Sequence, residues 1–180
     1  QVAAIETADL AVLTTAQLTG LTTEQVQALT TDQIVGLTTA QAAGFTTTNI
    51  AALTTSQVSA IETRDLAALT TAQVKVITTE QFGNLTTDQV AVLKTSQLVA
   101  LSTSVVSNLT TDQIVGLTTT QAKSLTSTQI GALSTTQVAA IETADMAVLT
   151  TAQLAGLTTA QAQALTTDQI VGLTTAQAAT

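Results

Sequence analysis

The sequence contains no cysteine, proline, histidine, tryptophan or tyrosine, and its only aromatic residues are Phe45 and Phe82. Without cysteine the chain can form neither disulfides nor thiolate metal sites. Without histidine it lacks the side chain that most often serves as a general base. Aromatic side chains supply much of the buried area of ordinary globular cores. A core in this chain must therefore be thin and built from leucine, valine, isoleucine and alanine.

Positive charge is also scarce. Four basic residues stand against 12 acidic ones, which gives a net charge of −8 and an isoelectric point near 4.1. Nucleic acids and anionic membranes attract clustered basic residues, whereas Arg64, Lys75, Lys94 and Lys123 are scattered. No apolar run is long enough for a transmembrane helix, and no signal-peptide pattern is visible. We therefore predict no nucleic-acid partner and no membrane span.

What the sequence does contain is one pattern, Leu-Thr-Thr-x-Gln, which recurs every eight residues. Counting each octad from its opening apolar residue, there are 22 starts from Ile5 to Leu173 without an insertion or deletion. Position three is threonine in 21 units, with Ser127 as the exception; position five is glutamine in 17, and position six is always apolar. A period this strict indicates a repeat architecture rather than a domain with a pocket.

The octad is compatible with more than one secondary structure. A continuous helix is excluded, because eight residues advance it by about 800° and the apolar stripe would rotate roughly 80° per unit. A β-solenoid stays as the alternative, since threonine and valine favour strands. Its corners, however, usually need glycine, asparagine or aspartate at fixed positions, and the eight glycines here are placed irregularly.

A helix start explains the octad best. With position two as N-cap, its hydroxyl accepts from the N–H of position five, and the glutamine there accepts from the N-cap N–H, which is a capping box. In the same register positions one and six form a hydrophobic staple, as in Leu13 with Leu18, Leu29 with Ile34 and Leu109 with Ile114. All acidic residues lie at positions two, four or five, where the helix dipole favours negative charge. The sequence predicts an all-α solenoid, a superhelix of very short helices, one per octad, with a corner at positions eight, one and two.

Three units, which open at Ile5, Ile61 and Ile141, depart from the pattern and have the sequence I-E-T-x-D. Glutamate is a weak N-cap, so we expect the following threonines to cap instead: Thr7, Thr63 and Thr143. The pair Glu6 and Asp9 could be imagined as a catalytic acid and base, but we interpret it as a solvated helix start.

The array shows a second, longer repeat. Residues 1–44 recur as residues 137–180 with five differences, which indicates duplication of a 17-octad block. No linker composition interrupts the chain. We therefore predict a single continuous array over residues 1–180 and, because Gln1 and Thr180 fall within the repeat, an excerpt of a longer polypeptide.

The side chains for catalysis or ligand binding are missing. Threonine and serine are plentiful, but no histidine or suitably placed lysine can activate them. Calcium-loop and phosphate-loop patterns are absent. We predict no catalytic, cofactor-binding or metal-binding residues, no cofactor, and a protein that is not an enzyme.

Two resemblances bear on function. The segment Leu21–Val26 (L-T-T-E-Q-V) resembles the helix start of TAL-effector repeats, but the basic DNA-binding stripe of those repeats is absent. The whole chain is similar to the threonine-rich short-repeat regions of very large secreted bacterial surface proteins, including adhesin-like ones. That resemblance implies an extracellular stalk, fibre or self-assembling filament at the cell surface, with head-to-tail or lateral self-association. The alternative is a binding module whose threonine rows engage ice or polysaccharide, such as a surface glycan.

Overall fold

A computed structural model describes residues 2–179, and the terminal residues of the predicted array, Gln1 and Thr180, lie outside the described part. Within it the chain forms 22 α-helices and one 3₁₀-helix, with no strand. Every α-helix begins at octad position three, so each unit contributes one helix. The predicted all-α solenoid of one-octad helices is confirmed, and the β-solenoid alternative is wrong.

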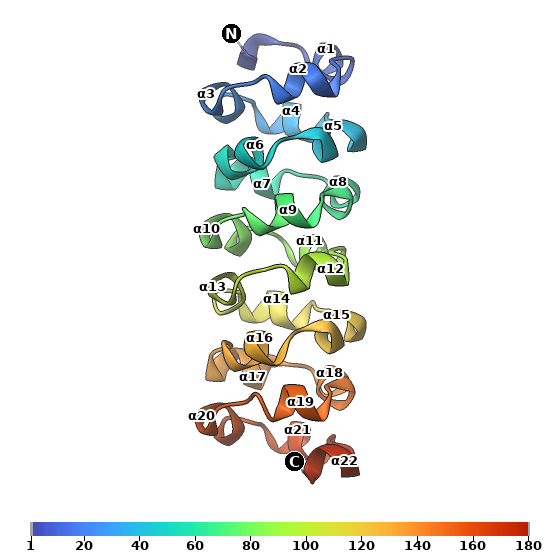
Figure 1. Ribbon diagram of the computed structural model, residues 1–180, viewed down its shortest axis with the longest axis vertical. Helices are drawn as coiled ribbons and strands as arrows, with labels where there is room; N and C mark the ends of the chain where they lie inside the picture. Colours follow the sequence, from blue (N-terminus) through green and yellow to red (C-terminus); the bar gives the residue numbers. More distant parts are fainter. Residues whose placement is uncertain (1, 180) are drawn as a thin grey trace. The chain divides into compact units, whose positions relative to one another are not determined.

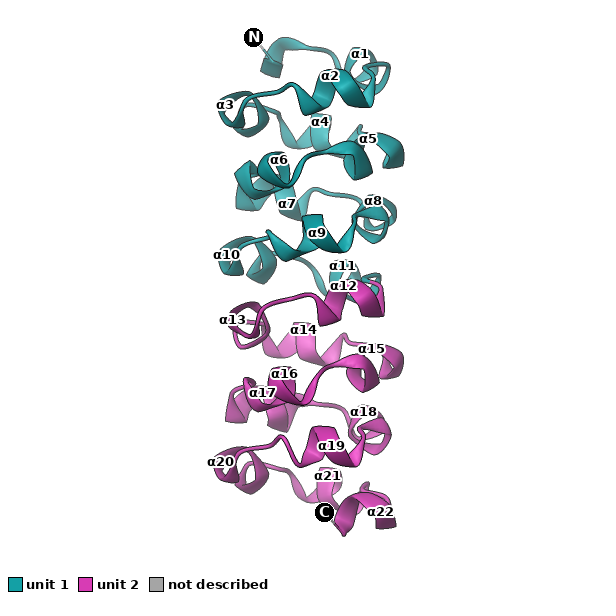
Figure 2. Ribbon diagram, in the orientation of Figure 1, with its two compact units in different colours: residues 1–93 teal, residues 94–180 magenta. Residues whose placement is uncertain are grey.

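The contacts divide the chain into two compact units, residues 1–93 and residues 94–180 (Figure 2). The octad pattern itself runs on through Leu93 and Lys94 without a break. The prediction of a single continuous array is not tested by this division and stays a prediction. The two units are described separately.

Unit 1 is a coil of short helices in which each helix packs on the third helix along the chain, as α2 does on α5 and α5 on α8 (Figure 1). The unit contains η1 (Val2–Ala4), α1 (Thr7–Ala11), α2 (Thr15–Thr19), α3 (Thr23–Gln27), α4 (Thr31–Val35), α5 (Thr39–Gly44), α6 (Thr47–Ala52), α7 (Thr55–Ser59), α8 (Thr63–Ala68), α9 (Thr71–Lys75), α10 (Thr79–Gly83) and α11 (Thr87–Ala91).

Unit 2 repeats this arrangement, with α12 packed on α15 and α15 on α18. It contains α12 (Thr95–Val99), α13 (Thr103–Val106), α14 (Thr111–Val115), α15 (Thr119–Ser124), α16 (Ser127–Gly131), α17 (Thr135–Ala140), α18 (Thr143–Val148), α19 (Thr151–Leu154), α20 (Thr159–Gln163), α21 (Thr167–Val171) and α22 (Thr175–Ala178).

The helices start where the capping box places them. In α4 the Gln33 N–H donates to Thr30 Oγ1 at 3.2 Å, and the Thr30 N–H donates to Gln33 Oε1 at 2.8 Å. The same reciprocal pair occurs in α2 to α7, α9 to α11, α14 to α17 and α19 to α22. Helices of this length do not persist alone in water. The capping box therefore defines their ends, and packing must keep them folded.

The corners between helices use ordinary backbone conformations. Leu53 (φ −57°, ψ 141°) and Thr54 (φ −72°, ψ 162°) are extended between α6 and α7. No described residue has a positive φ, glycine included. The corner is confirmed at positions one and two, whereas position eight keeps a helical backbone, as Ala52 does at the end of α6. The corner needs no conformation reserved for glycine.

Some glycines are needed instead for close approach between turns. A Cβ on Gly156, the C-cap region of α19, would lie 2.8 Å from the Ser127 carbonyl oxygen on α16, the helix against which α19 packs. A Cβ on Gly131 of α16 would likewise lie 2.8 Å from the Gly156 oxygen. Gly83 in α10 has nothing within 4 Å of such an atom. Only some of the glycines are therefore dictated by packing.

The core consists of octad positions one and six. Both members of the staple pairs Leu29 with Ile34 and Leu109 with Ile114 are buried, whereas Leu13 in the first turn is half-buried. Phe45 and Phe82 occupy these same two positions and are also buried, as is Met146, which fills a leucine position. The expected thin aliphatic core is confirmed.

Candidate functional site

The most regular polar feature of both units is a set of buried glutamines at position five, which join each turn to the one before it. We call these side chains interturn glutamines. Gln57 Nε2, for example, donates to the Val26 oxygen at 2.8 Å and to the Leu29 oxygen at 2.7 Å. These bonds span 31 and 28 residues, and Gln161 makes the same pair to Ile130 and Leu133 in unit 2. The side-chain oxygen of each such glutamine therefore caps its own helix, and the side-chain nitrogen donates to backbone carbonyls of the preceding turn.

The burial of these glutamines depends on whether a turn precedes them. Gln17 and Gln25, in the first described turn, make capping boxes but are exposed. From Gln33 onward every glutamine at position five is buried. A glutamine in the same local structure is therefore exposed where no described turn precedes it, and buried where a preceding turn covers it.

Position six shows the opposite dependence. Leu10, Leu18 and Val26 of the first turn are fully buried. In the last described turn, by contrast, Ala162 and Ala178 are exposed and Ile170 is 54% exposed. A turn therefore presents glutamine amides toward the preceding turn and apolar side chains with backbone carbonyls toward the following one. These two faces are complementary, and the coil has a direction.

The I-E-T-x-D units do not behave as expected. Their helices begin in register at Thr7, Thr63 and Thr143, and the N-cap residue is the glutamate, which makes no side-chain capping bond. The expectation that the threonines become N-caps was wrong. Negative charge at a helix start is favourable even without a hydrogen bond, and the extended N-cap backbone, common to all units, maintains the register.

The aspartates of these units are not equivalent. Glu6 and Asp9, in the first turn, are exposed, as interpreted. Asp65 and Asp145, however, are 1% and 2% exposed, so the interpretation of a solvated helix start fails for the two later units. A preceding turn covers them as it covers the glutamines at the same octad position.

Asp65 is held by two neighbours. Thr39, in α5, donates its hydroxyl to Asp65 Oδ1 at 2.6 Å, and Arg64 Nε lies 3.6 Å from the same oxygen. Arg64 also forms an ion pair with Glu62 at 2.6 Å. The second oxygen, Asp65 Oδ2, is buried and has no hydrogen-bond partner among the described residues.

Asp145 has alanine, Ala144, where Asp65 has Arg64. Burial raises the pKa of Asp145 from 3.8 to about 6, and the nearby negative charge of Glu142 adds to the rise. A carboxyl with this pKa changes charge in the mildly acidic range. Asp145 is thus a titratable group inside the otherwise uncharged core of unit 2. Sequence reasoning missed this group.

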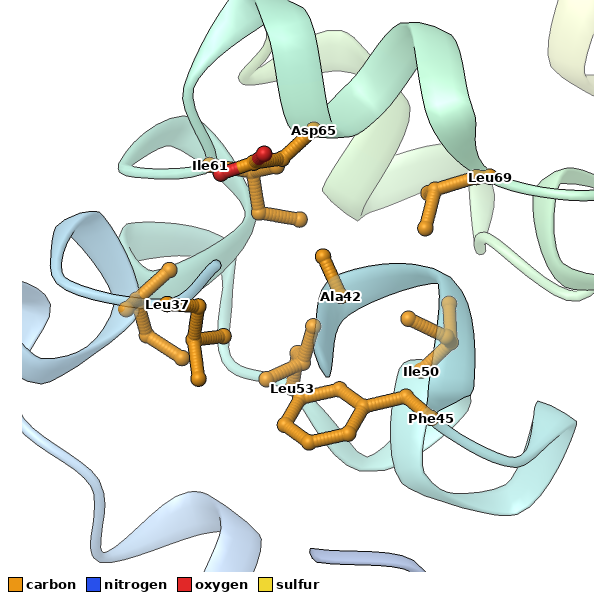
Figure 3. Close-up of a pocket in the computed structure, with 9 residues that line it drawn as sticks. Leu37, Ala42, Phe45, Ile50, Leu53, Ile61, Asp65 and Leu69 are labelled. Carbon is orange, nitrogen blue, oxygen red and sulfur yellow. The ribbon is translucent and has the colours of Figure 1, made fainter. Parts of the chain in front are cut away.

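Each of these aspartates lines a small apolar cavity of about 10 Å³. Ile34, Leu37, Ala42, Ile61 and Asp65 line the first, in unit 1 (Figure 3). The second, in unit 2, is lined by the residues 80 positions later, including Ile114, Leu117, Ala122, Ile141 and Asp145. A volume of this size is about that of a single water molecule. Neither cavity can hold a substrate.

The outer surface offers shallow features only. An open groove of about 440 Å³ is lined by Thr23, Thr47, Thr48 and small residues, and its counterpart in unit 2, of about 560 Å³, by Thr103, Ser127 and Thr128. Among the described residues no group of three or more acidic side chains is placed to hold a metal ion. No helix in the described part has the length and apolar character needed to cross a bilayer. The predicted absence of catalytic, cofactor and metal sites stays a prediction.

Comparison with known proteins gives one match. The model of the ALTTAQ repeat family matches four segments, residues 2–39, 58–95, 90–127 and 138–175, which together cover well over half of the chain. No curated protein and no solved structure matches the chain.

Proposed function

The chain belongs to the ALTTAQ repeat family, and from that premise we propose that it is a non-enzymatic structural protein that forms a stalk, fibre or self-assembling filament. The observation that supports this most strongly is the complementarity of the two faces of a turn. The first turn exposes the amides of Gln17 and Gln25, and the last exposes Ile170 and Val171. Inside each unit, faces of these two kinds are packed together.

Two copies of this 180-residue chain can associate head to tail through the same complementarity. In the proposed contact, Gln17 and Gln25 of one copy donate to carbonyls of the last turn of another, as Gln57 donates to Val26 and Leu29 within unit 1. A recess of about 340 Å³, lined by Leu154, Leu157, Leu165 and Leu173 among others, provides the apolar part. A contact of this heterologous kind that does not close gives open filaments.

The first prediction concerns this association. Sedimentation at increasing protein concentration should show elongated multimers for the unaltered chain and mostly monomers for the double variant Gln17→Glu and Gln25→Glu. Glutamate keeps the capping oxygen but cannot donate, so the helices stay capped. The double variant Ala16→Glu and Gln27→Glu adds the same two negative charges at exposed positions of the same turn; it is the charge-matched control and should associate normally. Monomers of the unaltered chain at all concentrations would refute head-to-tail assembly.

We place the protein outside the cell, at a bacterial surface. The similarity of the octads to threonine-rich repeats of secreted surface proteins supports this location. Labelling of intact cells with an antibody against the octads tests it, and a signal that appears only after the cells are permeabilised would argue against it.

The second candidate function is binding of a periodic target, ice or polysaccharide, by threonine rows. The hydroxyl-lined grooves at Thr23 and Thr48 and at Thr103 and Thr128 support it, because equivalent residues recur in both units. Thermal hysteresis or co-sedimentation with an insoluble polysaccharide distinguishes this function from a passive shaft. Neither effect is expected if the protein only spans distance.

A further inference from the structure

At two places in the coil the buried side chain at octad position five is an aspartate, whereas at most of the other places it is an interturn glutamine. Asp65 in α8 and Asp145 in α18 lie at octad position five, and the helices against which they pack, α5 and α15, carry alanine at position six, Ala42 and Ala122. The contacts of α5 with α8 and of α15 with α18 are the most extensive between helices in their units. A short acidic side chain is thus matched with a small apolar one in both places.

This exchange changes the hydrogen-bond chemistry between the turns. A glutamine has an N–H₂ group that donates to the carbonyls 28 and 31 residues earlier, whereas an ionised carboxylate can only accept. For Asp145 these carbonyls belong to Leu117 and Ile114, and both residues line the same cavity as the carboxyl. The Leu117 oxygen receives no hydrogen bond from any described residue. The Ile114 oxygen accepts the Leu117 N–H at 3.2 Å, so with a charged Asp145 the Leu117 oxygen is the acceptor of this junction that has no donor.

A proton would supply the missing donor. We propose that Asp145 is an acid-dependent lock between turns of unit 2: when its carboxyl binds a proton, the O–H donates to the Leu117 carbonyl as the interturn glutamines do elsewhere, and α15 and α18 are held together more strongly than at neutral pH.

Asn49 shows that a side chain of this length can do so. It occupies position five of its octad, accepts the Thr46 N–H with Oδ1 at 3.0 Å and donates Nδ2 to the Leu21 oxygen, 28 residues earlier, at 3.1 Å. A protonated aspartate has nearly the same shape as asparagine and, like it, one donor and one acceptor side.

The charges around Asp145 favour proton uptake. Glu142, on the same helix, raises the proton affinity of Asp145. The helices packed against α18 carry Lys123 on α15 and Asp168 on α21, and both of these side chains are exposed to solvent. No basic side chain is therefore buried with the carboxyl.

Asp65 is the counterpart that has a cation beside it. Arg64 lies beside it, 3.6 Å away, and also pairs with Glu62. Of the helices packed against α8, α5 carries no charge and α11 carries the exposed Asp88. A neighbouring cation favours the ionised form of a carboxyl, and Asp145 has no such neighbour because alanine stands at position 144.

The direction of the pH dependence follows from the raised pKa. Folded Asp145 has a pKa of about 6 against 3.8 for an unperturbed carboxyl. The folded state therefore binds the proton more tightly than the unfolded state. The stabilisation is fully present below about pH 4 and is lost as the pH rises through 6.

The test uses thermal unfolding of the full chain at pH 5.0 and pH 7.5, followed by circular dichroism. We expect Asp145→Asn to raise the midpoint at pH 7.5 by about 4 °C and at pH 5.0 by roughly half as much, because asparagine supplies the donor at both pH values and pH 5.0 lies between 3.8 and 6. Asp9→Asn removes a charge from the same motif where no turn precedes it, and should leave the pH dependence as in the unaltered chain. If the unfolding midpoints of the two variants depend on pH in the same way, the lock does not exist.

A second measurement does not depend on stability. The carboxyl carbon of Asp145, followed by NMR, should titrate near pH 6. Ala144→Arg, which copies the Arg64 arrangement, should move the Asp145 midpoint downward. A midpoint for Asp145 near the unperturbed 3.8, or no response to Ala144→Arg, would contradict the proposal.

Discussion

Single residues at position five act on two turns at once. The oxygen of Gln57 accepts the Thr54 N–H within its own octad, and its nitrogen donates to carbonyls of the preceding turn. Gln25 makes only the first of these contacts, because no described turn precedes it. The energetic role of a glutamine therefore depends on its turn, although its octad position is the same.

Replacing the amide nitrogen separates the two roles. Gln57→Glu should lower the free energy of unfolding by about 3 kcal/mol, since a buried group would face carbonyls that have lost their donor. Gln25→Glu, which is exposed and lies near a helix start, should be neutral or stabilising by up to about 1 kcal/mol. Urea unfolding followed by circular dichroism measures both. Similar losses for the two variants would show that the interturn bonds do not matter.

Glycine substitutions give a second matched pair. Gly156→Ala should destabilise the chain by roughly 1–3 kcal/mol, because the new Cβ would overlap the Ser127 oxygen and overpacking costs about this much. Gly83→Ala should stabilise α10 by about 0.5–1 kcal/mol, because alanine is the better helix former and the site is open. Differential scanning calorimetry distinguishes the two, and opposite signs are the expected result.

At the scale of the element, most helices are defined by their N-terminal capping box. Besides the three helices with a glutamate N-cap, α12 is an informative exception, because its N-cap is Lys94 and an ammonium group has no lone pair to accept a hydrogen bond. Only the half of the box in which the Lys94 N–H donates to Gln97 Oε1, at 2.7 Å, is present.

Restoring the hydroxyl should strengthen this helix. Lys94→Thr should raise the free energy of unfolding by about 1 kcal/mol, the usual contribution of a threonine N-cap over alanine. Lys94→Ala removes the lysine without adding an acceptor and should have a much smaller effect. Hydrogen exchange of the α12 amides is the most direct measurement. Equal protection in the two variants would mean that the cap contributes nothing there.

The helices could be predicted from the sequence because their determinants are local. The N-cap threonine and the glutamine three residues later lie within one octad, so the helix starts could be placed from the sequence, except in the three I-E-T-x-D units, where the N-cap was expected one residue too late. The interturn bonds of Gln57 could not, since no single octad indicates which carbonyls, 28 and 31 residues earlier, lie beneath it.

The buried aspartates were missed for a related reason. Asp9, Asp65 and Asp145 share the same local sequence, and only the covering turn distinguishes the first from the others. One signal was present: Ala42 precedes Asp65, and Ala122 precedes Asp145, by the same 23 residues. That pairing becomes meaningful once helices are known to pack three octads apart.

At the scale of the whole molecule, stability comes from contacts between neighbouring turns, as in other repeat proteins. Because the octads carry the same set of donors, acceptors and apolar groups, deletion of one complete octad leaves each remaining glutamine above an equivalent pair of carbonyls. Deletion of part of an octad shifts the following glutamines out of register with those carbonyls.

Deletion of residues 85–92, one octad, should therefore leave the helical signal per residue unchanged, whereas deletion of residues 85–88 should reduce it. The first deletion lies outside both aspartate–alanine pairs, so it does not disturb them. Far-UV circular dichroism of the two shortened chains is the measurement. Equal loss of helix in both would show that register between turns is unimportant.

The one-way direction of the glutamine bonds has a mechanical consequence. Under tension along the coil of one unit, the contacts between successive turns lie in series and bear the same force, so one turn can come free while the others stay paired. A turn of three octads that comes free can extend by about 80 Å as an open strand. When the tension falls, its glutamines meet the same carbonyls again, so the array can lengthen under load and shorten afterwards without losing its order.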